Sequence, residues 1–441
     1  MGAILTPQIP PAVFRRRRET LARKIGNGAL VLTAASVKTK SRDCAHPYSP
    51  DRYLYYFCGF TEPQCALLMD AQNGRIRREI LLCRPRDKNA EQWEGERAGP
   101  LRARRRLQIA ESGDIAEFDS CLEELLNKRA AVYCLPGADA VLDKKLSAAA
   151  RLRRLQNRAG GGALRAICDV SAHADDMRTI KDGEEIALLR RAAETTAAGH
   201  RAAMRAAALA KTEYEIEAAL VSAFRAANAT HAFSPIVAAG ENACTLHYGA
   251  NSGRVFNRDL VLLDAGAECG FYAGDMSRTF PAGGKFSPAQ AAVYDTVLTA
   301  QRRALAAVRA GARWSAVEDA AARAICRGLA RLGICKGNAK TIFAKKQYRR
   351  FYMHRIGHFI GLDVHDTGSM READGKPRIL RTGMTLTVEP GLYIPRAEDI
   401  PPPYRGIGVR IEDAVAVRPG GYELLAEAPK TRAEIESWMR G

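Results

Sequence analysis

The chain has 441 residues, of which 47% are hydrophobic and 26% charged, and this composition excludes disordered and collagen-like proteins. No apolar run reaches about 18 residues, so we expect no membrane span. The formal net charge is +18, but the arginine runs 15–18 and 104–106 are short and lack interleaved aromatic residues. We therefore expect both runs on solvated helix faces, and we expect no nucleic-acid or membrane partner.

The cysteine pattern and the first residues bear on the cellular compartment. The eleven cysteines are odd in number and have no CxxC spacing, which disfavours a disulfide framework. The start of the sequence has no apolar stretch of the kind that forms a secretory signal. We therefore expect reduced thiols and a cytoplasmic location. Residues 1–6 fit a loose N-myristoylation pattern, but we expect no acylation there.

Short apolar runs alternate with helical or turn-rich segments in the first part of the chain. They predict strands at 29–33, 65–69, 79–83 and 131–135. A basic helix is expected from about Lys144 to Arg158, ended by glycines 160–162, and a last apolar segment follows at 166–170. Such alternation is typical of an α/β layer domain. We place the domain boundary at about 174–180 and divide the chain into residues 1–176 and 177–441.

The second domain begins with helical periodicity and continues with short strands. Apolar spacing predicts one helix from Asp182 to Ala210, a second over 212–227 and a helical block at 287–332. The expected strands are 260–264, 270–273, 385–389, 409–412 and 414–417. This order is typical of an α+β domain with a mostly antiparallel sheet.

Four acidic residues follow or interrupt the apolar strands of this domain: Asp264, Asp275, Glu389 and Glu412. A lone carboxylate is costly to bury, so each needs a compensating partner. Each could be a separate strand-end carboxylate that is capped or paired with an arginine. Three histidines within twelve residues, His354, His358 and His365, instead favour one shared metal site.

The composition of this cluster indicates the metal and the chemistry. Two divalent cations would balance the charge of four carboxylates, and an oxygen-rich set with one histidine favours Mn²⁺ or a similar ion over structural zinc. Two metals roughly 3.5–4 Å apart can ionise a bridging water and polarise a carbonyl, which predicts hydrolysis.

The histidine segment itself does not have the pattern of a zinc helix. Histidines at i and i+4 could suggest one, but Arg355 replaces the glutamate of HExxH. Gly357 and Gly361 also disfavour a helix. We therefore expect an irregular or extended segment over 354–366.

Segment 354–366 resembles the signature of aminopeptidase P and prolidase, which are pita-bread metallopeptidases. The similarity to aminopeptidase P extends in order over nearly the whole chain, through the motifs Thr245–Tyr248, Asp264–Gly266, Gly274–Asp275, Thr387–Tyr393 and Gly406–Asp413. The resemblance implies a creatinase-like α/β N-terminal domain followed by an α+β pita-bread catalytic domain.

The resemblance also implies a role for each motif residue. Asp264 would chelate one metal, Asp275 and Glu412 would bridge both, and His358 and Glu389 would hold the other. Glu389 would also pass a proton from water to the leaving nitrogen.

Further residues of the motifs are implied around the metals. His365 would donate to the oxyanion, and His247 and His354 would line the pocket on the proline side, with Tyr393 and Arg410 nearby. We assign Glu389, His365 and His247 to the catalytic set.

The implied activity is release of the N-terminal residue from peptides with proline in the second position. The bond before proline is a tertiary amide without N–H and needs a shaped pocket. A prolidase that cuts only Xaa-Pro dipeptides remains the alternative. A non-catalytic binding protein and creatinase are disfavoured because the metal ligands are present, and methionine aminopeptidase normally lacks this first domain.

The sequence departs from the family pattern in the first domain. Tyr53 stands where aspartate is common, and Cys58 replaces threonine, so a substrate contact from this segment is open. Trp93 lies where the family can place a tryptophan near a neighbouring subunit's site. It would there contribute to substrate binding, and the resemblance implies a homodimer or homotetramer.

Overall fold

The computed structural model describes residues 9–156 and 164–440, and the chain divides into two compact units, Met1–Met177 and Arg178–Gly441. The glycine run 160–162 and the pattern at residues 1–6 lie outside the described residues. Within the described ranges, no helix is both long and apolar enough to cross a membrane. All eleven cysteines are free thiols.

The first unit is built on a six-stranded mixed sheet in the order β6-β5-β4-β1-β7-β8. These strands confirm the four that the apolar runs predict, and their bounds are β1 (Gly28–Thr33), β4 (Ala66–Gln72), β5 (Arg75–Cys83), β6 (Glu111–Asp114), β7 (Ala131–Cys134) and β8 (Ala166–Asp169). Both faces of β1 and β4 are buried, as expected for the apolar runs 29–32 and 66–69 within them. The domain is therefore of the α/β layer type.

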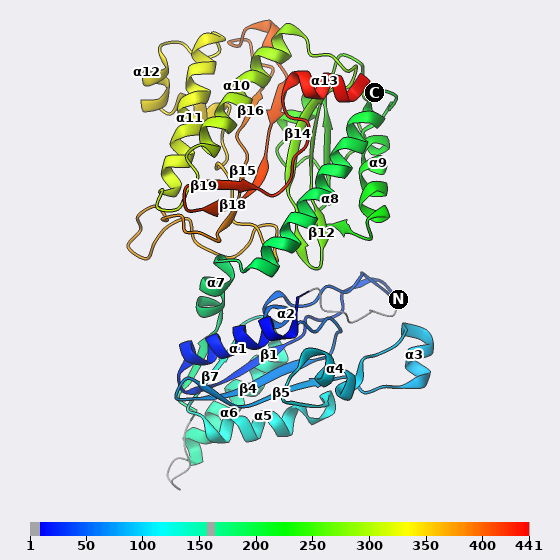
Figure 1. Cartoon of the computed structure of the whole chain (residues 1–441), viewed down its shortest axis with the longest axis vertical. Coiled ribbons are helices and arrows are strands. Elements are labelled where there is room, and N and C mark those ends of the chain that lie inside the picture. The colour runs from blue at the N-terminus through cyan, green and yellow to red at the C-terminus, as the bar shows by residue number, and fades with distance from the viewer. Residues whose placement is uncertain (1–8, 157–163, 441) are drawn as a thin grey trace. The chain divides into compact units, whose positions relative to one another are not determined.

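Helices cover both faces of this sheet (Figure 1). One face carries α1 (Pro11–Ile25) and α2 (Arg52–Cys58), and the other carries α5 (Phe118–Lys128) and α6 (Ala140–Gln156). The remaining elements are short: β2 (Thr39–Ser41), β3 (Cys44–Ala45), α3 (Lys88–Glu94), α4 (Gly99–Leu107) and α7 (Ser171–Thr179), which contains the division between the units.

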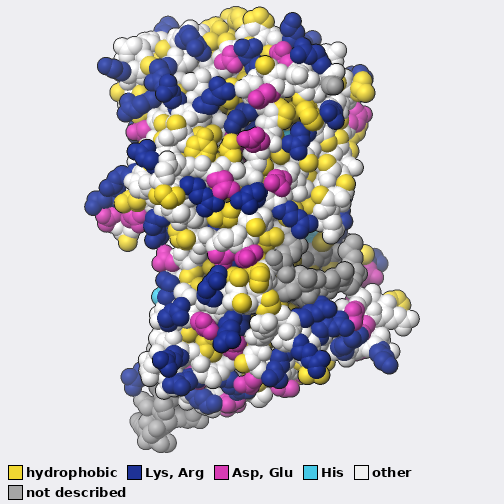
Figure 2. Space-filling view, viewed as in Figure 1, with side chains coloured by type: hydrophobic (Ala, Val, Ile, Leu, Met, Phe, Trp, Pro, Cys, Tyr) yellow, Lys and Arg dark blue, Asp and Glu magenta, His cyan; other side chains and the backbone are white. Residues whose placement is uncertain are grey.

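One prediction about the arginine runs is wrong. Arg17 and Arg18 are 4% and 0% exposed, although run 15–18 was expected on a solvated face. Arg18 donates from Nε to Glu79 Oε2 at 2.7 Å, and this partner lies on β5, too far along the chain to be inferred from spacing. Run 104–106 is exposed as expected, and Figure 2 shows basic side chains interspersed with acidic ones over the visible face.

The second unit consists of two halves, each with a helix pair and a small antiparallel sheet. In the first half, α8 (Gly183–Ala207) and α9 (Glu213–Ala226) confirm the two predicted helices. A capping box between Asp182 and Glu185 starts α8. The sheet has the order β10-β11-β14, with β10 (Ile236–Ala239), β11 (Leu260–Ala265) and β14 (Met276–Pro281).

In the second half, the predicted helical block is two helices, α10 (Pro288–Leu305) and α11 (Trp314–Arg331). Gly311 separates them with a φ of 84°, a left-handed conformation that a helix cannot contain. The sheet has the order β15-β18-β19, with β15 (Thr385–Val388), β18 (Asp413–Arg418) and β19 (Gly421–Leu424). Figure 1 shows the strands lying between the α8/α9 pair and the α10/α11 pair.

The remaining strands correct two predicted boundaries. They are β9 (Thr230–His231), β12 (Ala267–Cys269), β13 (Tyr272–Ala273), β16 (Gly391–Ile394) and β17 (Ile407–Arg410), and the last helices are α12 (Ala339–Ala344) and α13 (Arg432–Arg440). Gly270 and Phe271 have φ values of 59° and 69° and form a turn, so only residues 272–273 are a strand. The predicted strand 409–412 ends at Arg410, which leaves Glu412 between two sheets.

Candidate metal centre

A close approach of two glycines positions the first two carboxylates. Asp264 lies on β11 opposite Ser277 of β14, and Asp275 immediately precedes β14. A Cβ on Gly266 would lie 1.7 Å from the carbonyl oxygen of Gly274, so a larger residue would force these backbones apart. The motifs Asp264–Gly266 and Gly274–Asp275 therefore act together to hold Asp264 on β11 close to Asp275 at the start of β14.

Segment 354–366 contains no helix, as the sequence predicts, and its first part runs along β15. The Thr387 amide donates to the His358 carbonyl at 2.9 Å, and the Glu389 amide donates to the Ile356 carbonyl at 2.8 Å. A Cβ on Gly357 would lie 2.0 Å from the Thr387 carbonyl oxygen. This glycine therefore permits the approach that places His358 beside Glu389.

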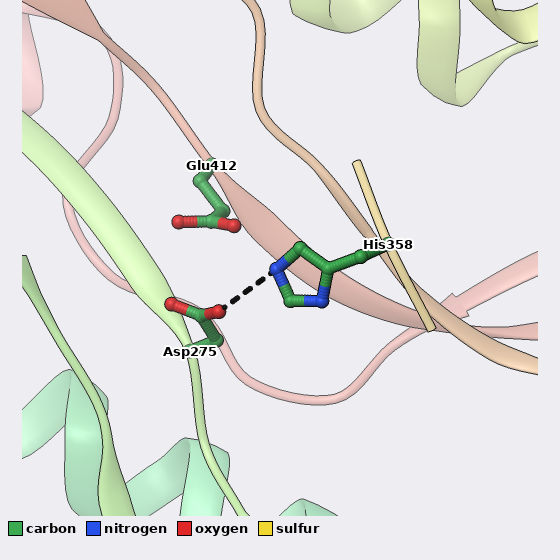
Figure 3. Close-up of side chains that lie close together, drawn as sticks. All are labelled: Asp275, His358 and Glu412. Atoms are coloured by element: carbon green, nitrogen blue, oxygen red, sulfur yellow. Dashed lines mark ion pairs between the residues drawn. The ribbon is translucent and has the colours of Figure 1, made fainter. Parts of the chain in front are cut away.

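These elements bring an imidazole and several carboxylates together. His358 Nε2 lies 3.3 Å from Asp275 Oδ2 and 3.7 Å from Glu389 Oε1. One ligand atom each of Asp275, His358 and Glu412 lies within 4.8 Å of the others (Figure 3). His358 Nδ1 is 2.9 Å from the Phe359 carbonyl, to which it donates, so Nε2 is the nitrogen that faces the carboxylates and is left to bind a metal once it loses its proton.

Asp264 provides a direct indication that the cluster suits a cation. Its Oδ2 accepts from Arg410 Nη2 at 2.6 Å. Its Oδ1 is buried and has no hydrogen-bond partner among the described residues. An unpaired buried carboxylate oxygen is costly, and a divalent cation would satisfy it. The donors present therefore fit a divalent metal centre.

When no cation is present, burial and mutual repulsion disfavour the ionised forms of the carboxylates in this centre. Burial raises the pKa of Asp275, raises that of Glu389 to about 7 and raises that of Glu412 well above its ordinary value. Burial alone would lower the pKa of His358, but the hydrogen bond and charge of Asp275 raise it to about 9. Protons therefore occupy the centre in the absence of metal, and metal binding must displace them.

The metal-free protein is expected to lose stability relative to the metal-loaded protein as the pH rises. The pKa of Glu389 rises from 4.5 in the unfolded chain to about 7 in the metal-free fold, so the fold keeps a proton that the unfolded chain has released. The free energy of unfolding of the metal-free protein therefore falls as the pH rises from about 4.5 to 7. The pKa of His358 is raised from 6.5 to about 9, so the stability that its protonated form contributes is lost as the pH rises from about 6.5 to 9. The melting temperatures of loaded and chelated protein should differ by roughly 5 °C more at pH 8 than at pH 5. A difference that narrows toward pH 8 would contradict the described charge balance.

A cavity of about 700 Å³ opens onto this centre. The predicted residues that line it are Asp264, Asp275, His358, Glu389, Glu412, His247, His354, His365 and Arg410. Tyr393 lies behind the wall, where its hydroxyl accepts from Arg410 Nη1 and donates to His354 Nε2, both at 2.9 Å. Trp93 lies in the first unit, on α3, where it is 89% exposed.

His365 is held through its neighbour in sequence. Its exposed ring lies 4.3 Å from the ring of His358, and no described residue hydrogen-bonds it. The next residue, Asp366, is buried and accepts from Arg178 Nη2 and Lys181 Nζ, each at 2.6 Å. The charges of these two cations overcome the effect of burial and hold the pKa of Asp366 below its usual range.

Sequence reasoning missed two residues that organise the site. Ser277 donates to Glu412 Oε2 at 2.9 Å and accepts from Arg410 Nε at 2.9 Å, so it joins a carboxylate to a guanidinium. Asp366 belongs to the segment that the sequence singled out, but its partners precede it by 185 and 188 residues. The sequence could have indicated Ser277, because it lies two residues after Asp275 and side chains two residues apart in extended backbone point to the same side.

The fold and the site define a two-unit protein with a carboxylate-rich metal centre in a cleft, as in metal-dependent hydrolases. Residues 187–419 match metallopeptidase family M24, and residues 14–133 match the N-terminal domain of aminopeptidase P. The chain belongs to the aminopeptidase P members of metallopeptidase family M24 and is a hydrolase. This confirms the predicted fold class, an α/β first domain followed by an α+β pita-bread domain.

Similar proteins match over almost their full lengths. A Xaa-Pro aminopeptidase of Haemophilus influenzae is 39% identical over 435 residues, covering 98% of each chain. A structure of aminopeptidase P from Escherichia coli in complex with substrate is 38% identical, with a TM-score of 0.94 and 98% of each chain covered. A zinc-substituted form of the Escherichia coli protein in complex with product is 37% identical, with a TM-score of 0.94 and 98% of each chain covered.

Proposed function

We propose that the protein is a Xaa-Pro aminopeptidase, which releases the first residue of peptides that have proline in the second position. The convergence of five metal-ligating side chains on one cavity carries this proposal: Asp264, Asp275, His358, Glu389 and Glu412. The full-length similarity to proteins named Xaa-Pro aminopeptidase supports it. The comparisons do not favour the alternative of a dipeptide-specific prolidase.

The proposed ligand set holds two divalent ions. Asp264 would bind one ion, Asp275 and Glu412 would bridge both, and His358 and Glu389 would bind the other. We propose Mn²⁺, because four carboxylates balance two divalent charges and the donors are mostly oxygen. When bound, such ions supply Lewis-acid polarisation of a carbonyl and lower the pKa of a water molecule.

Two side chains are proposed to handle protons and charge during hydrolysis. Glu389, which lines the cavity beside His358, would accept a proton from water and deliver it to the proline nitrogen as the peptide bond breaks. Partial burial lowers the pKa of His365, which favours its neutral imidazole. A neutral imidazole still has one N–H, which His365 would donate to the developing oxyanion.

The proline ring would occupy the part of the cavity near His247 and His354. Phe233, Ile236 and Leu246 also line the cavity and offer apolar surface to a pyrrolidine ring. The chain of hydrogen bonds from Asp264 through Arg410 and Tyr393 fixes the His354 imidazole. This arrangement needs no N–H from the substrate, and a proline peptide bond offers none.

We further propose that the protein works as a homodimer or homotetramer in the cytoplasm, without a nucleic-acid partner. Trp93 is the most exposed large hydrophobic residue described, and its large apolar surface suits packing against a second subunit, near whose substrate it would lie. The eleven free thiols suit a reducing compartment.

Hydrolysis of Arg-Pro-Pro and Arg-Pro by chelated and by Mn²⁺-restored protein tests the proposal. We expect Mn²⁺-dependent release of arginine from the tripeptide. Chelation should abolish this release because the ligand carboxylates then hold protons instead of metal. Cleavage of the dipeptide alone would indicate a prolidase. Absence of cleavage of either peptide, with metal shown to be bound, would contradict the proposed function.

A further inference from the structure

Arg355 is a charged residue of the cavity wall that the proposed mechanism does not use. The lining carboxylates of the metal centre face the proposed ions, and the other lining arginine, Arg410, is buried and paired with Asp264. Arg355 is exposed, and no carboxylate of the described residues forms an ion pair with it. Its charge is therefore available to a molecule in the cavity.

The structure holds the Arg355 head group against the cavity wall. Its Nη1 donates to Met370 Sδ at 3.2 Å, and Met370 also lines the cavity. Its carbonyl oxygen lies 2.8 Å from His354 Nδ1, which fixes the backbone of residue 355 to the proposed proline pocket. A guanidinium has five N–H donors, and this sulfur contact occupies one of them.

The position of Arg355 suits the part of a peptide that follows proline. His354 Nδ1 lies 3.8 Å from Glu389 Oε2, and Arg355, the next residue in the chain, lines the same cavity as both. An extended peptide advances about 3.3–3.6 Å per residue, so its third residue lies roughly 7 Å beyond the scissile bond. Arg355 shares the cavity with Glu389 and His354, so its long side chain suits contact with the residue that follows a proline held at His354.

We propose that Arg355 is a specificity-determining residue that binds a carboxylate on the third residue of the substrate. This inference rests on the proposed function and narrows its substrate class to peptides Xaa-Pro-Yaa in which Yaa bears a carboxylate. That group is either the C-terminal carboxylate of a tripeptide or an acidic side chain. A guanidinium binds a carboxylate through two parallel N–H bonds, and a cleft strengthens the attraction relative to open solvent.

Two matched pairs of substrates distinguish the two sources of the carboxylate. One pair is Ala-Pro-Ala as free acid and as amide, and the other is Ala-Pro-Glu-amide and Ala-Pro-Gln-amide. We expect kcat/KM of the wild-type enzyme to favour the carboxylate of at least one pair by about fivefold, the size of one exposed charge pair. The preference should lie in KM and should shrink with added salt.

Substitutions at position 355 then test the residue itself. Arg355→Gln should abolish the preference, Arg355→Glu should reverse it, and Arg355→Lys should retain part of it. Arg371→Gln is the matched control, because Arg371 is an exposed arginine of a neighbouring loop that does not line the cavity. Equal rates within both pairs in the wild type, or an unchanged preference in Arg355→Gln, would overturn this inference alone. Failure to cleave all four peptides would overturn the proposed function as well.

Discussion

Asp275→Ala and Glu412→Ala are each expected to abolish metal binding and turnover. These side chains converge with His358 within 4.8 Å, and the proposed mechanism has each carboxylate shared between two cations. Removing one leaves too few ligands and an unbalanced charge. Because a bound metal contributes several kcal/mol to transition-state stabilisation, kcat should fall by about 10³-fold or more. Metal content by mass spectrometry and tripeptide hydrolysis measure the two effects.

The stability of the same variants separates loss of metal from loss of fold. Burial raises the pKa of Asp275 and of Glu412, so their ionised forms destabilise the metal-free fold. Chelated Asp275→Ala should therefore melt no lower than the chelated wild type at pH 8. Asp295→Ala, which removes a partly exposed carboxylate paired with Arg432, serves as the control with full activity. Full activity of Asp275→Ala or Glu412→Ala would contradict the two-metal mechanism.

Asp413→Ala is expected to destabilise the second unit by about 3–5 kcal/mol, the cost of breaking a buried ion pair from one side. Asp413 is 1% exposed and accepts from Arg278 Nη2 at 2.7 Å, and from Lys430 Nζ and Gln301 Nε2 at 2.5 Å each. Its loss leaves the buried Arg278 guanidinium without its carboxylate. The melting temperature should fall by roughly 10 °C in a thermal scan of the full chain.

Asp399→Ala is the matched control for this stability prediction. Asp399 also pairs with an arginine, Arg350, but both side chains are about half exposed or more. Exposed pairs contribute about 0–1 kcal/mol, so this variant should melt within a few degrees of the wild type. If Asp413→Ala and Asp399→Ala melted at the same temperature as the wild type, the buried cluster would not stabilise the fold as described.

The elements of the fold that rest on local pattern could be predicted from the sequence. Continuous apolar runs predicted β1 and β4, and helical spacing predicted α8 and α9. The boundary at Gly311 was missed because a periodic apolar pattern continues on both sides of the turn. The burial of Arg18 was missed for a different reason, because its partner Glu79 lies 61 residues away on another element.

For the site too, local motifs could be recognised in the sequence, whereas contacts between distant residues could not. The four carboxylates could be singled out because each follows or interrupts an apolar strand, and the resemblance to aminopeptidase P implies their roles as metal ligands. The unpaired Oδ1 of Asp264, the orientation of the His358 ring and the link through Ser277 depend on contacts between distant segments. Ser277 and Glu412, for example, are 135 positions apart, and spacing in one sequence does not reveal such contacts.

The tripeptide assay, performed as a metal titration, tests the central claim most directly. Chelated protein receives Mn²⁺ in increments while the release of arginine from Arg-Pro-Pro is measured. The proposed ligand set predicts that activity rises until about two ions are bound per chain and that arginine is the first product. Full activity with one ion per chain would contradict the two-metal centre. Metal-loaded protein that releases no arginine from the tripeptide would contradict the proposed peptidase activity itself.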